Sequence, residues 1–172
     1  RAFESISLGV SEVKLIDIVS AYSAIANNGI LIKPISITSI FDNENHEIKQ
    51  FYPDFKEVAN ENDIFILRDI MKDVIRSDVG TGRSIRTKYN FNYNNLGLAG
   101  KTGTTNDKTN AWFIGFTPQI TIGIWVGMDD PSISLGNFQY GSSAALPIFA
   151  KAISKIYDLG QFSYNNSQII LD

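Results

Sequence analysis

The run Lys101-Thr102-Gly103-Thr104-Thr105 places a cation, three hydroxyl groups and a glycine next to one another. A lysine ammonium supplies positive charge to an anion, and threonine hydroxyls can donate hydrogen bonds to it. Alternate side chains of a β-strand share a face, so the hydroxyls of Thr102 and Thr104 are expected on the same face. Gly103 has no side chain, which would let a ligand approach the backbone closely. The run therefore predicts an anion-binding strand edge.

Two further strands are expected to support this edge. Residues 98–104 carry the motif, and residues 110–116 and 120–127 form two apolar runs joined by the turn Thr117-Pro118-Gln119. Both runs are apolar at nearly every position, which indicates that both faces of the strands are covered.

The spacing of apolar residues predicts helices that would cover the faces of this sheet. An apolar stripe predicts a helix over residues 12–28 that stops at Gly29, and a second helix is predicted over residues 62–77. Residues 147–157 read as a final helix that packs on the sheet. The residues expected to face inward are Val13, Ile16, Val19, Ala24 and Ile25 in the first helix, and Ile66, Ile70, Val74 and Ile75 in the second.

The remaining segments connect these elements. Residues 35–41 and 46–51 flank a turn-rich tetrad and predict a β-hairpin, whereas residues 87–97 are expected to be irregular. We expect an α+β fold, an antiparallel sheet packed with helices. The predicted organisation is a helical and hairpin part over residues 1–97, the Lys-Thr-Gly strand with its sheet and final helix over residues 98–158, and a loose tail over residues 159–172.

Composition narrows the possible functions. The chain has 172 residues, 44% of them hydrophobic, a net charge of −3 and no cysteine. Disulfides and thiolate metal sites are therefore excluded, and nothing in the charge favours a nucleic-acid partner. No window has the roughly 18 apolar residues of a membrane span, so no membrane contact is expected from this segment. His46 is expected in the hairpin turn, and Asp129-Asp130 is interpreted as a turn, so neither a metal nor a cofactor is predicted.

The chain resembles a known family at several points. Lys-Thr-Gly is the third signature of penicillin-binding proteins and serine β-lactamases. Here it is extended to Lys-Thr-Gly-Thr-Thr and followed by Ala-Trp-Phe and Gly-Phe-Thr-Pro. With these motifs the chain resembles the transpeptidase domain of class A penicillin-binding proteins. Matching segments lie along nearly the whole chain, at residues 8–13, 21–29, 80–83, 125–131 and 141–147.

The resemblance implies a role for each residue of the motif. Lys101 and Thr104 would be catalytic: Lys101 would raise the positive potential and help to relay a proton, and the Thr104 amide would be an oxyanion donor. Thr102, Gly103, Thr104 and Thr105 would bind substrate, the Thr102 and Thr104 hydroxyls taking a substrate or β-lactam carboxylate. Arg83 is interpreted either as a substrate contact or as a capping or surface residue.

The family also needs a nucleophilic serine in Ser-x-x-Lys and a Ser-x-Asn, both before Lys-Thr-Gly. Ser11-Glu12-Val13-Lys14 fits the first pattern, but we interpret Ser11 as a helix N-cap. Ser163-Tyr164-Asn165 fits the second but follows Lys-Thr-Gly. We therefore expect the nucleophile to lie outside this chain, which would be the C-terminal portion of a transpeptidase domain and inactive alone.

The resemblance implies peptidoglycan cross-linking by a DD-transpeptidase, a serine acyl transfer on D-alanyl-D-alanine stem peptides. The implied partners are these stem peptides and β-lactam antibiotics, and the implied place is the bacterial inner membrane, with the domain facing the periplasm or cell exterior. Two alternatives remain open: hydrolysis by a DD-carboxypeptidase or β-lactamase, and a non-catalytic sensor or scaffold with the same fold.

Overall fold

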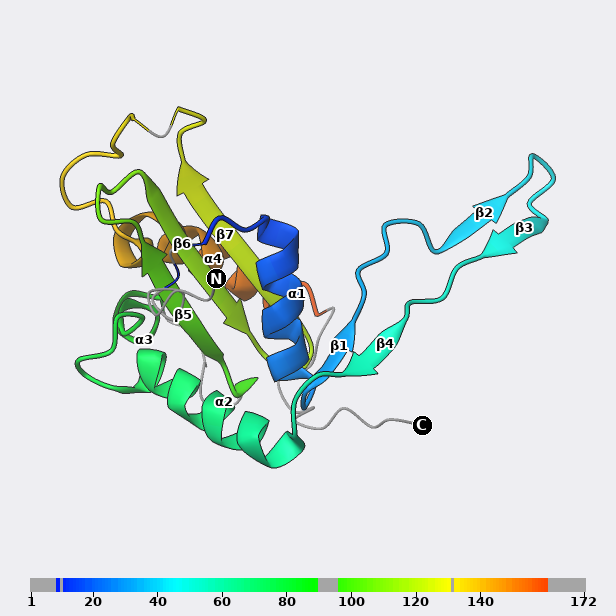
Figure 1. Cartoon of the computed structure of the whole chain (residues 1–172), viewed down its shortest axis with the longest axis horizontal. Coiled ribbons are helices and arrows are strands. Elements are labelled where there is room, and N and C mark those ends of the chain that lie inside the picture. The colour runs from blue at the N-terminus through cyan, green and yellow to red at the C-terminus, as the bar shows by residue number, and fades with distance from the viewer. Residues whose placement is uncertain (1–8, 10, 90–95, 131, 161–172) are drawn as a thin grey trace.

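A three-stranded antiparallel sheet forms the centre of the molecule in the computed structural model, which describes residues 9, 11–89, 96–130 and 132–160 (Figure 1). The strands are β5 (Ala99–Thr104), β6 (Asn110–Phe116) and β7 (Thr121–Gly127), in the order β5-β6-β7. The predicted strands are thus confirmed, with β6 at the expected bounds. The predicted turn joins β6 to β7, and the Thr117 hydroxyl accepts there from the amides of Gln119 and Ile120.

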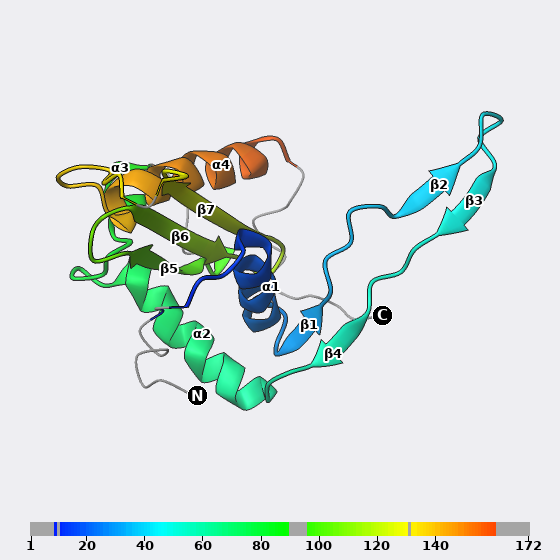
Figure 2. The ribbon, with the colours of Figure 1, turned by 45° about the horizontal axis from the view of Figure 1, so that its top comes forward.

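Helices cover both faces of this sheet, as the turned view in Figure 2 shows. Helix α1 (Leu15–Ala26) lies on one face, and the π-helical turn η3 (Gly141–Ala145) with helix α4 (Leu146–Asp158) lies on the other. Two strand glycines let the helices approach closely. A Cβ on Gly123 would lie 2.3 Å from Val19 Cγ2, and one on Gly115 would lie 2.4 Å from Phe149 Cζ. The α+β fold is confirmed.

The main core lies between the sheet and α4. The rings of Phe113 and Phe149 lie 4.7 Å apart between centroids, and both side chains are fully buried. Burial of such aromatic side chains contributes several kcal/mol, on the order of 1.5–3 each. The other fully buried large side chains of this cluster are Ile75, Ile85, Leu146 and Ile153.

Helix α2 (Glu61–Arg76) flanks β5 and buries a different stripe from the one predicted. Asn60 caps it by accepting from the amide of Asn62 at 2.8 Å. The buried residues are Ile64, Met71 and Ile75. Ile66 and Ile70, expected to face inward, are 59% and 62% exposed, so that part of the prediction was wrong. The helix is apolar at many adjacent positions, and its period alone did not select the buried face.

Helix α3 (Ser84–Lys88) follows α2 and was not predicted. Its last two residues, 87 and 88, belong to the segment 87–97 that we expected to be irregular. Its Ile85 is fully buried in the main core, so this short helix is fixed by packing. Residues 90–95 of that segment lie outside the described residues.

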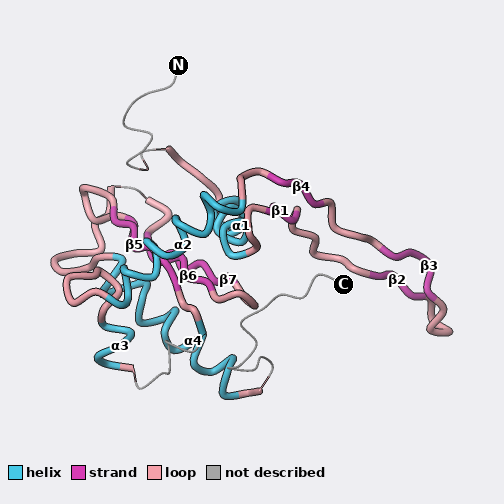
Figure 3. Tube along the Cα trace, turned by 90° about the horizontal axis from the view of Figure 1, so that it is seen from below, coloured by secondary structure: helices cyan, strands magenta, loops and turns pink. Residues whose placement is uncertain are grey.

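A long two-stranded arm projects from the helices and sheet (Figures 1 and 3). Its base pairs β1 (Ile30–Ile32) with β4 (Phe55–Glu57), and its outer part pairs β2 (Ser39–Phe41) with β3 (Glu47–Gln50), both antiparallel. The predicted hairpin is confirmed, with shorter strands than expected and an additional pairing at the base.

The start of α1 corrects one sequence interpretation. The helix begins at Leu15, its N-cap residue is Lys14, and no side chain caps it. Ser11 is therefore not the N-cap, and Val13 and Ile16, expected to be inward, are 51% and 54% exposed. The helix ends at Ala26 with Asn27 as its C-cap, slightly before the predicted end at residue 28. Gly29 follows, with a φ of +91° and no room for a Cβ, which would lie 2.2 Å from Ala59 O.

Two expectations concern the chain ends. The predicted tail from residue 161 onward, including Ser163-Tyr164-Asn165, lies outside the described residues. Within the described part, every helix is too short or too polar to cross a bilayer.

Candidate active-site strand

Strand β5 carries the Lys-Thr-Gly run along one edge of the sheet. It pairs with β6 on one side, and no described strand pairs with its other side. An edge strand of this kind presents unpaired backbone amides and carbonyls to any extended chain that lies beside it. We call this side of β5, over residues 101–104, the outer edge.

The hydrogen-bond pattern shows which backbone groups reach the outer edge. The Thr105 amide donates to the Asn110 carbonyl at 3.1 Å, so Thr105 and Asn110 face one another as a hydrogen-bonded pair. Such pairs alternate with non-hydrogen-bonded pairs along an antiparallel ladder. Thr104 and Thr102, opposite Ala111 and Phe113, are then non-hydrogen-bonded pairs. Their amides and carbonyls therefore point away from β6, toward the outer edge.

Lys101 extends along this edge. The side chain is exposed, and Nζ donates a hydrogen bond to the Thr102 carbonyl at 2.8 Å. That carbonyl is one of the groups that point away from β6. The ammonium group and the Thr104 amide therefore lie on the same side of the strand, which is the arrangement that stabilises a developing negative charge.

The hydroxyls of Thr102 and Thr104 share a face, as the strand alternation predicted. Thr102 Oγ1 lies 2.8 Å from Thr81 Oγ1 in a hydroxyl–hydroxyl hydrogen bond. Thr104 Oγ1 accepts from the Gly141 amide at 3.0 Å. Thr81 and Gly141 were not assigned to the site from the sequence, since they lie 21 and 37 residues away along the chain. In the sequence these segments were marked only by their resemblance to the family, at residues 80–83 and 141–147.

Gly103 also lies close to its cross-strand neighbour, whereas the approach of a substrate to its backbone stays a prediction. A Cβ on Gly103 would lie 3.2 Å from Trp112 Cβ, its cross-strand neighbour, and not in open space beside the strand. On Gly141, a Cβ would lie 2.6 Å from the Gly103 carbonyl oxygen and 2.4 Å from that of Trp112. The absence of side chains at Gly103 and Gly141 therefore allows sheet and η3 to pack together around the motif.

Thr105 holds the turn between β5 and β6. Its hydroxyl accepts from the amides of Thr109 and Asn110, at 3.1 and 3.0 Å, and also bonds the Thr109 hydroxyl. These bonds fix the end of β5. A contact of Thr105 with substrate stays a prediction.

The turn that carries Thr81 is held by charged groups. Arg86 donates a hydrogen bond to the Asp78 carboxylate, and Arg83 donates to the Asp78 carbonyl at 2.8 Å. The hydrogen bond and charge of Arg86, with a smaller effect from Arg83, hold the pKa of Asp78 below its usual value. Arg83 thus has a surface capping role, one of the two roles considered for it.

A recess of about 660 Å³ adjoins this turn. It lies between residues 79–89 and the start of α4, and Thr81, Arg83, Ser142 and Ser143 are among its lining residues. Thr81, one of its lining residues, is also the residue that bonds Thr102 of the motif strand. Its hydroxyl and guanidinium groups suit a polar ligand that carries negative charge.

Other candidate residues lie outside this group. His46 is at the tip of the arm, 71% exposed, with Nδ1 3.2 Å from the Asp42 carboxylate. Asp130 accepts from the amide and hydroxyl of Ser132, which lower the pKa of Asp130. These bonds support the interpretation of Asp129-Asp130 as a turn. Trp112 packs against Trp125, with 6.2 Å between ring centroids.

The geometry agrees with a family relationship in sequence. A profile described as "Penicillin binding protein transpeptidase domain" matches residues 2–154. Penicillin-binding protein 1A of Aquifex aeolicus (strain VF5) is 31% identical over the whole of this chain, which covers 23% of that relative. The chain therefore belongs to the penicillin-binding protein transpeptidase family, and it spans about a quarter of the length of this relative.

Solved structures show the same fold. Penicillin-binding protein 1A from Haemophilus influenzae superposes with a TM-score of 0.83 at 22% identity, over 99% of this chain and 30% of that one. The imipenem acyl-enzyme complex of penicillin-binding protein A from M. tuberculosis superposes with a TM-score of 0.60 at 18% identity. That comparison covers 83% of this chain and 31% of the other.

Proposed function

We propose that this chain forms the Lys-Thr-Gly wall of the active site of a peptidoglycan DD-transpeptidase. The observation that carries the proposal is the outer edge of β5, where the Lys101 ammonium and the Thr104 amide lie on the side of the strand that faces away from β6. A stem peptide ending in D-alanyl-D-alanine would lie along this edge as an added strand, held by main-chain hydrogen bonds.

The reaction is a serine acyl transfer. A serine oxygen attacks the carbonyl carbon between the two D-alanines, and the bond to the terminal D-alanine breaks, releasing it as the free amino acid. An amine of a second stem peptide then attacks the acyl-enzyme ester, forms the new amide and frees the serine. The Thr104 amide would donate to the oxyanion in both tetrahedral intermediates.

The other motif residues would bind and orient substrate. Lys101 would raise the positive potential at the reacting centre and help to move a proton toward the leaving group. Thr102, already in contact with Thr81, would bind the substrate carboxylate, and the Thr104 hydroxyl would support it. β-Lactams would acylate the same serine, as in the imipenem acyl-enzyme of the M. tuberculosis relative.

We infer that the serine belongs to a longer protein anchored in the bacterial inner membrane, with this domain facing the periplasm or cell exterior. Residues 1–172 would then be the C-terminal portion of its transpeptidase domain. Ser11 is exposed and lies before α1, away from the strand motif in sequence and with no described contact to Lys101, so we assign it no catalytic role.

Labelling with a fluorescent penicillin tests this proposal. The protein encoded by the complete gene should be labelled covalently, and the chain of 172 residues should not be. An unlabelled full-length protein would favour the non-catalytic sensor or scaffold. Labelling of the isolated chain at Ser11 would overturn our assignment of the nucleophile.

A second assay separates the two enzymatic reactions. The full-length protein is incubated with a D-alanyl-D-alanine stem peptide and an amine acceptor. Transpeptidation gives the cross-linked peptide together with D-alanine, whereas a DD-carboxypeptidase gives D-alanine and the hydrolysed peptide alone. We expect the cross-linked product.

A further inference from the structure

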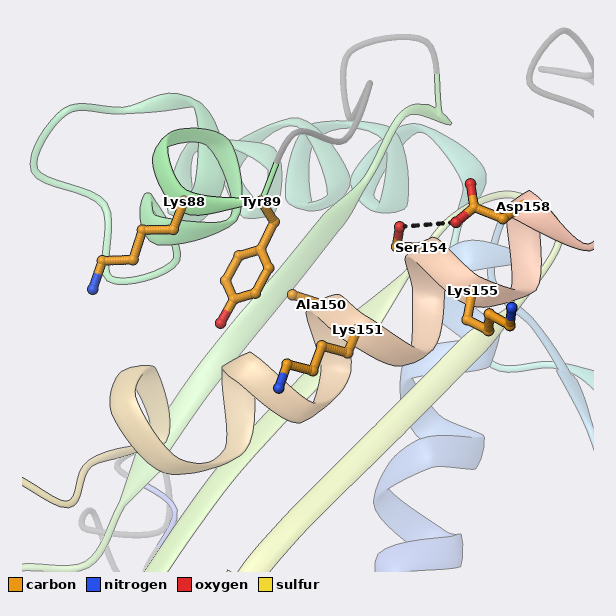
Figure 4. A pocket seen from close by; sticks show the side chains of 7 residues that line it. All are labelled: Lys88, Tyr89, Ala150, Lys151, Ser154, Lys155 and Asp158. Carbon is orange, nitrogen blue, oxygen red and sulfur yellow. Dashed lines mark hydrogen bonds between the residues drawn. The ribbon is translucent and has the colours of Figure 1, made fainter.

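A second recess, of about 380 Å³, lies between α3 and α4 and is lined by basic side chains. Lys88 comes from the end of α3, and Lys151 and Lys155 come from one face of α4, four residues apart (Figure 4). Tyr89 stands between the two helices, and the Lys88 and Lys151 side chains and the Tyr89 ring extend toward the same side of the recess. None of these residues belongs to the Lys-Thr-Gly strand.

The positive charge of this recess is not neutralised by nearby carboxylates. Within the described residues, no acidic side chain lies within ion-pair distance of the Lys88, Lys151 or Lys155 ammonium. Among the described residues that line the recess, Asp158 is the one with an acidic side chain, and its carboxylate accepts from Ser154 at 3.5 Å. Three cations and one anion leave the recess positive, in a chain with a net charge of −3.

The polar groups of the recess select the class of ligand. The Tyr89 hydroxyl makes no hydrogen bond to another residue in the described part of the chain, so it is available as a donor. Lysine ammoniums bind phosphate as point charges, and a phosphate ester offers them more negative charge and more acceptor oxygens than a carboxylate does. Ala150 is 1% exposed and closes the floor.

We propose that this recess binds a phosphate group, held by the ammoniums of Lys88 and Lys151 and the hydroxyl of Tyr89. A phosphate ester carries a charge of about −1.5 to −2 near neutral pH and three acceptor oxygens, which matches two ammoniums and a phenol. The recess is larger than a bare phosphate, so it has room for the group to which the phosphate is attached. The phosphate would come from a soluble phosphate compound or from a lipid headgroup.

The site is separate from the one proposed for acyl transfer. Lys88 and Tyr89 also line the larger recess beside Thr81, so a bound phosphate would lie next to the turn that contacts Thr102. No residue of the β5 motif lines the smaller recess itself.

Titration of the chain with inorganic phosphate, followed by amide chemical shifts, tests the proposal. We expect saturable shifts at residues 88–89 and 150–155, and a weakening of binding that follows added salt. The Lys88→Gln/Lys151→Gln variant should bind at least about tenfold more weakly, since each lost charge-assisted bond contributes more than a neutral one. The Lys33→Gln/Lys56→Gln variant has the same net charge, changes only exposed residues of the arm, and should bind normally.

Vesicles identify the source of the phosphate. The chain is mixed with phosphatidylglycerol vesicles and, separately, with phosphatidylcholine vesicles. Saturable binding of free phosphate indicates a soluble ligand, whereas binding only to phosphatidylglycerol vesicles indicates a lipid headgroup. Either result supports the proposal if the Lys88→Gln/Lys151→Gln variant no longer shows that binding. The proposal is overturned if neither probe binds, or if both double variants are affected equally.

Discussion

Lys101 combines exposure with a fixed direction, because its ammonium is held to the Thr102 carbonyl on the outer edge of β5. In the full-length protein, Lys101→Ala should therefore lower the rate of β-lactam acylation by about two to four powers of ten, the usual scale for groups that stabilise charge or move a proton. The rate is measured by stopped-flow quenching or by timed labelling with a fluorescent penicillin.

The same substitution should leave stability almost unchanged. An exposed side chain with one hydrogen bond to its neighbour contributes within about 0.5 kcal/mol. Lys56→Ala, on the arm, is the matched control and should acylate normally. An acylation rate within a few-fold of the unmodified protein would remove Lys101 from the mechanism.

Asp78 gives a prediction for pH. Its hydrogen bond and charge interaction with Arg86 lower the pKa of the carboxyl, so its contribution to stability is present above the unfolded pKa of about 4. That contribution is lost as the pH falls through the lower folded pKa. Asp78→Asn should therefore lower the thermal midpoint slightly at pH 6, by about a degree or two because the pair is exposed, and have a smaller effect at pH 2.

Thermal unfolding of both proteins over this pH range measures the difference. Asp54→Asn, on the arm, changes the net charge equally and should show no such dependence. An Asp78→Asn difference that is the same at pH 6 and pH 2 would show that the carboxylate charge is not what holds the turn.

At the scale of elements, η3 is the segment whose position the site depends on most directly. Gly141 donates to the Thr104 hydroxyl and has no room for a Cβ above Gly103 and Trp112. Gly141→Ala should therefore push η3 away from β5 and lower the free energy of unfolding by about 1–3 kcal/mol, as overpacking does. Urea denaturation of the isolated chain measures this loss.

A neighbouring substitution controls for this experiment. Ser142 follows Gly141 in η3, its side chain is half-buried, and Ser142→Ala adds no atoms. It should leave the unfolding midpoint close to that of the unmodified chain. Equal effects of the two substitutions would mean that the close approach of Gly141 is not the cause.

The elements differ in how well the sequence predicted them. Strand β6 was predicted at its observed bounds because residues 111–116 carry no polar side chain and a proline turn follows. The buried face of α2 was predicted only in part: Ile75 is buried, but Ile66 and Ile70 are exposed, because the choice between apolar faces depends on what packs against the helix. Short helix α3 forms because its Ile85 packs into the core, which no local pattern reveals.

The candidate site shows the same division. The alternation of Thr102 and Thr104 on one face follows from the period of a strand, so it was predictable from the sequence. The contacts of these hydroxyls with Thr81 and Gly141 join segments that are distant in the chain, and only the tertiary fold brings them together. The same holds for Lys88 and Lys151, which line one recess from two helices.

At the scale of the whole molecule, the arm and the sheet are structurally separable. The outer strands β2 and β3 pair closely with one another, and many side chains along the arm are exposed, among them Ile48, Tyr52 and Phe55 at 65%, 79% and 79%. Side chains this exposed contribute little apolar burial to the folded state. The free energy of unfolding should therefore come mainly from the sheet with α1, α2 and α4.

Shortening the arm tests this separation. The Lys33 amide donates to the Asp54 carbonyl at 2.8 Å, so the two strands are adjacent at that point. Replacing residues 34–53 by Asn-Gly would close the arm with a two-residue hairpin turn. We expect the free energy of unfolding in urea to change by less than about 1 kcal/mol, because little buried surface is lost and a shorter loop costs less entropy.

Phe149→Ala, in the main core, should by contrast lose about 3–5 kcal/mol in the same assay. A loss in the shortened chain as large as that of Phe149→Ala would show that the arm is part of the folding unit of the sheet.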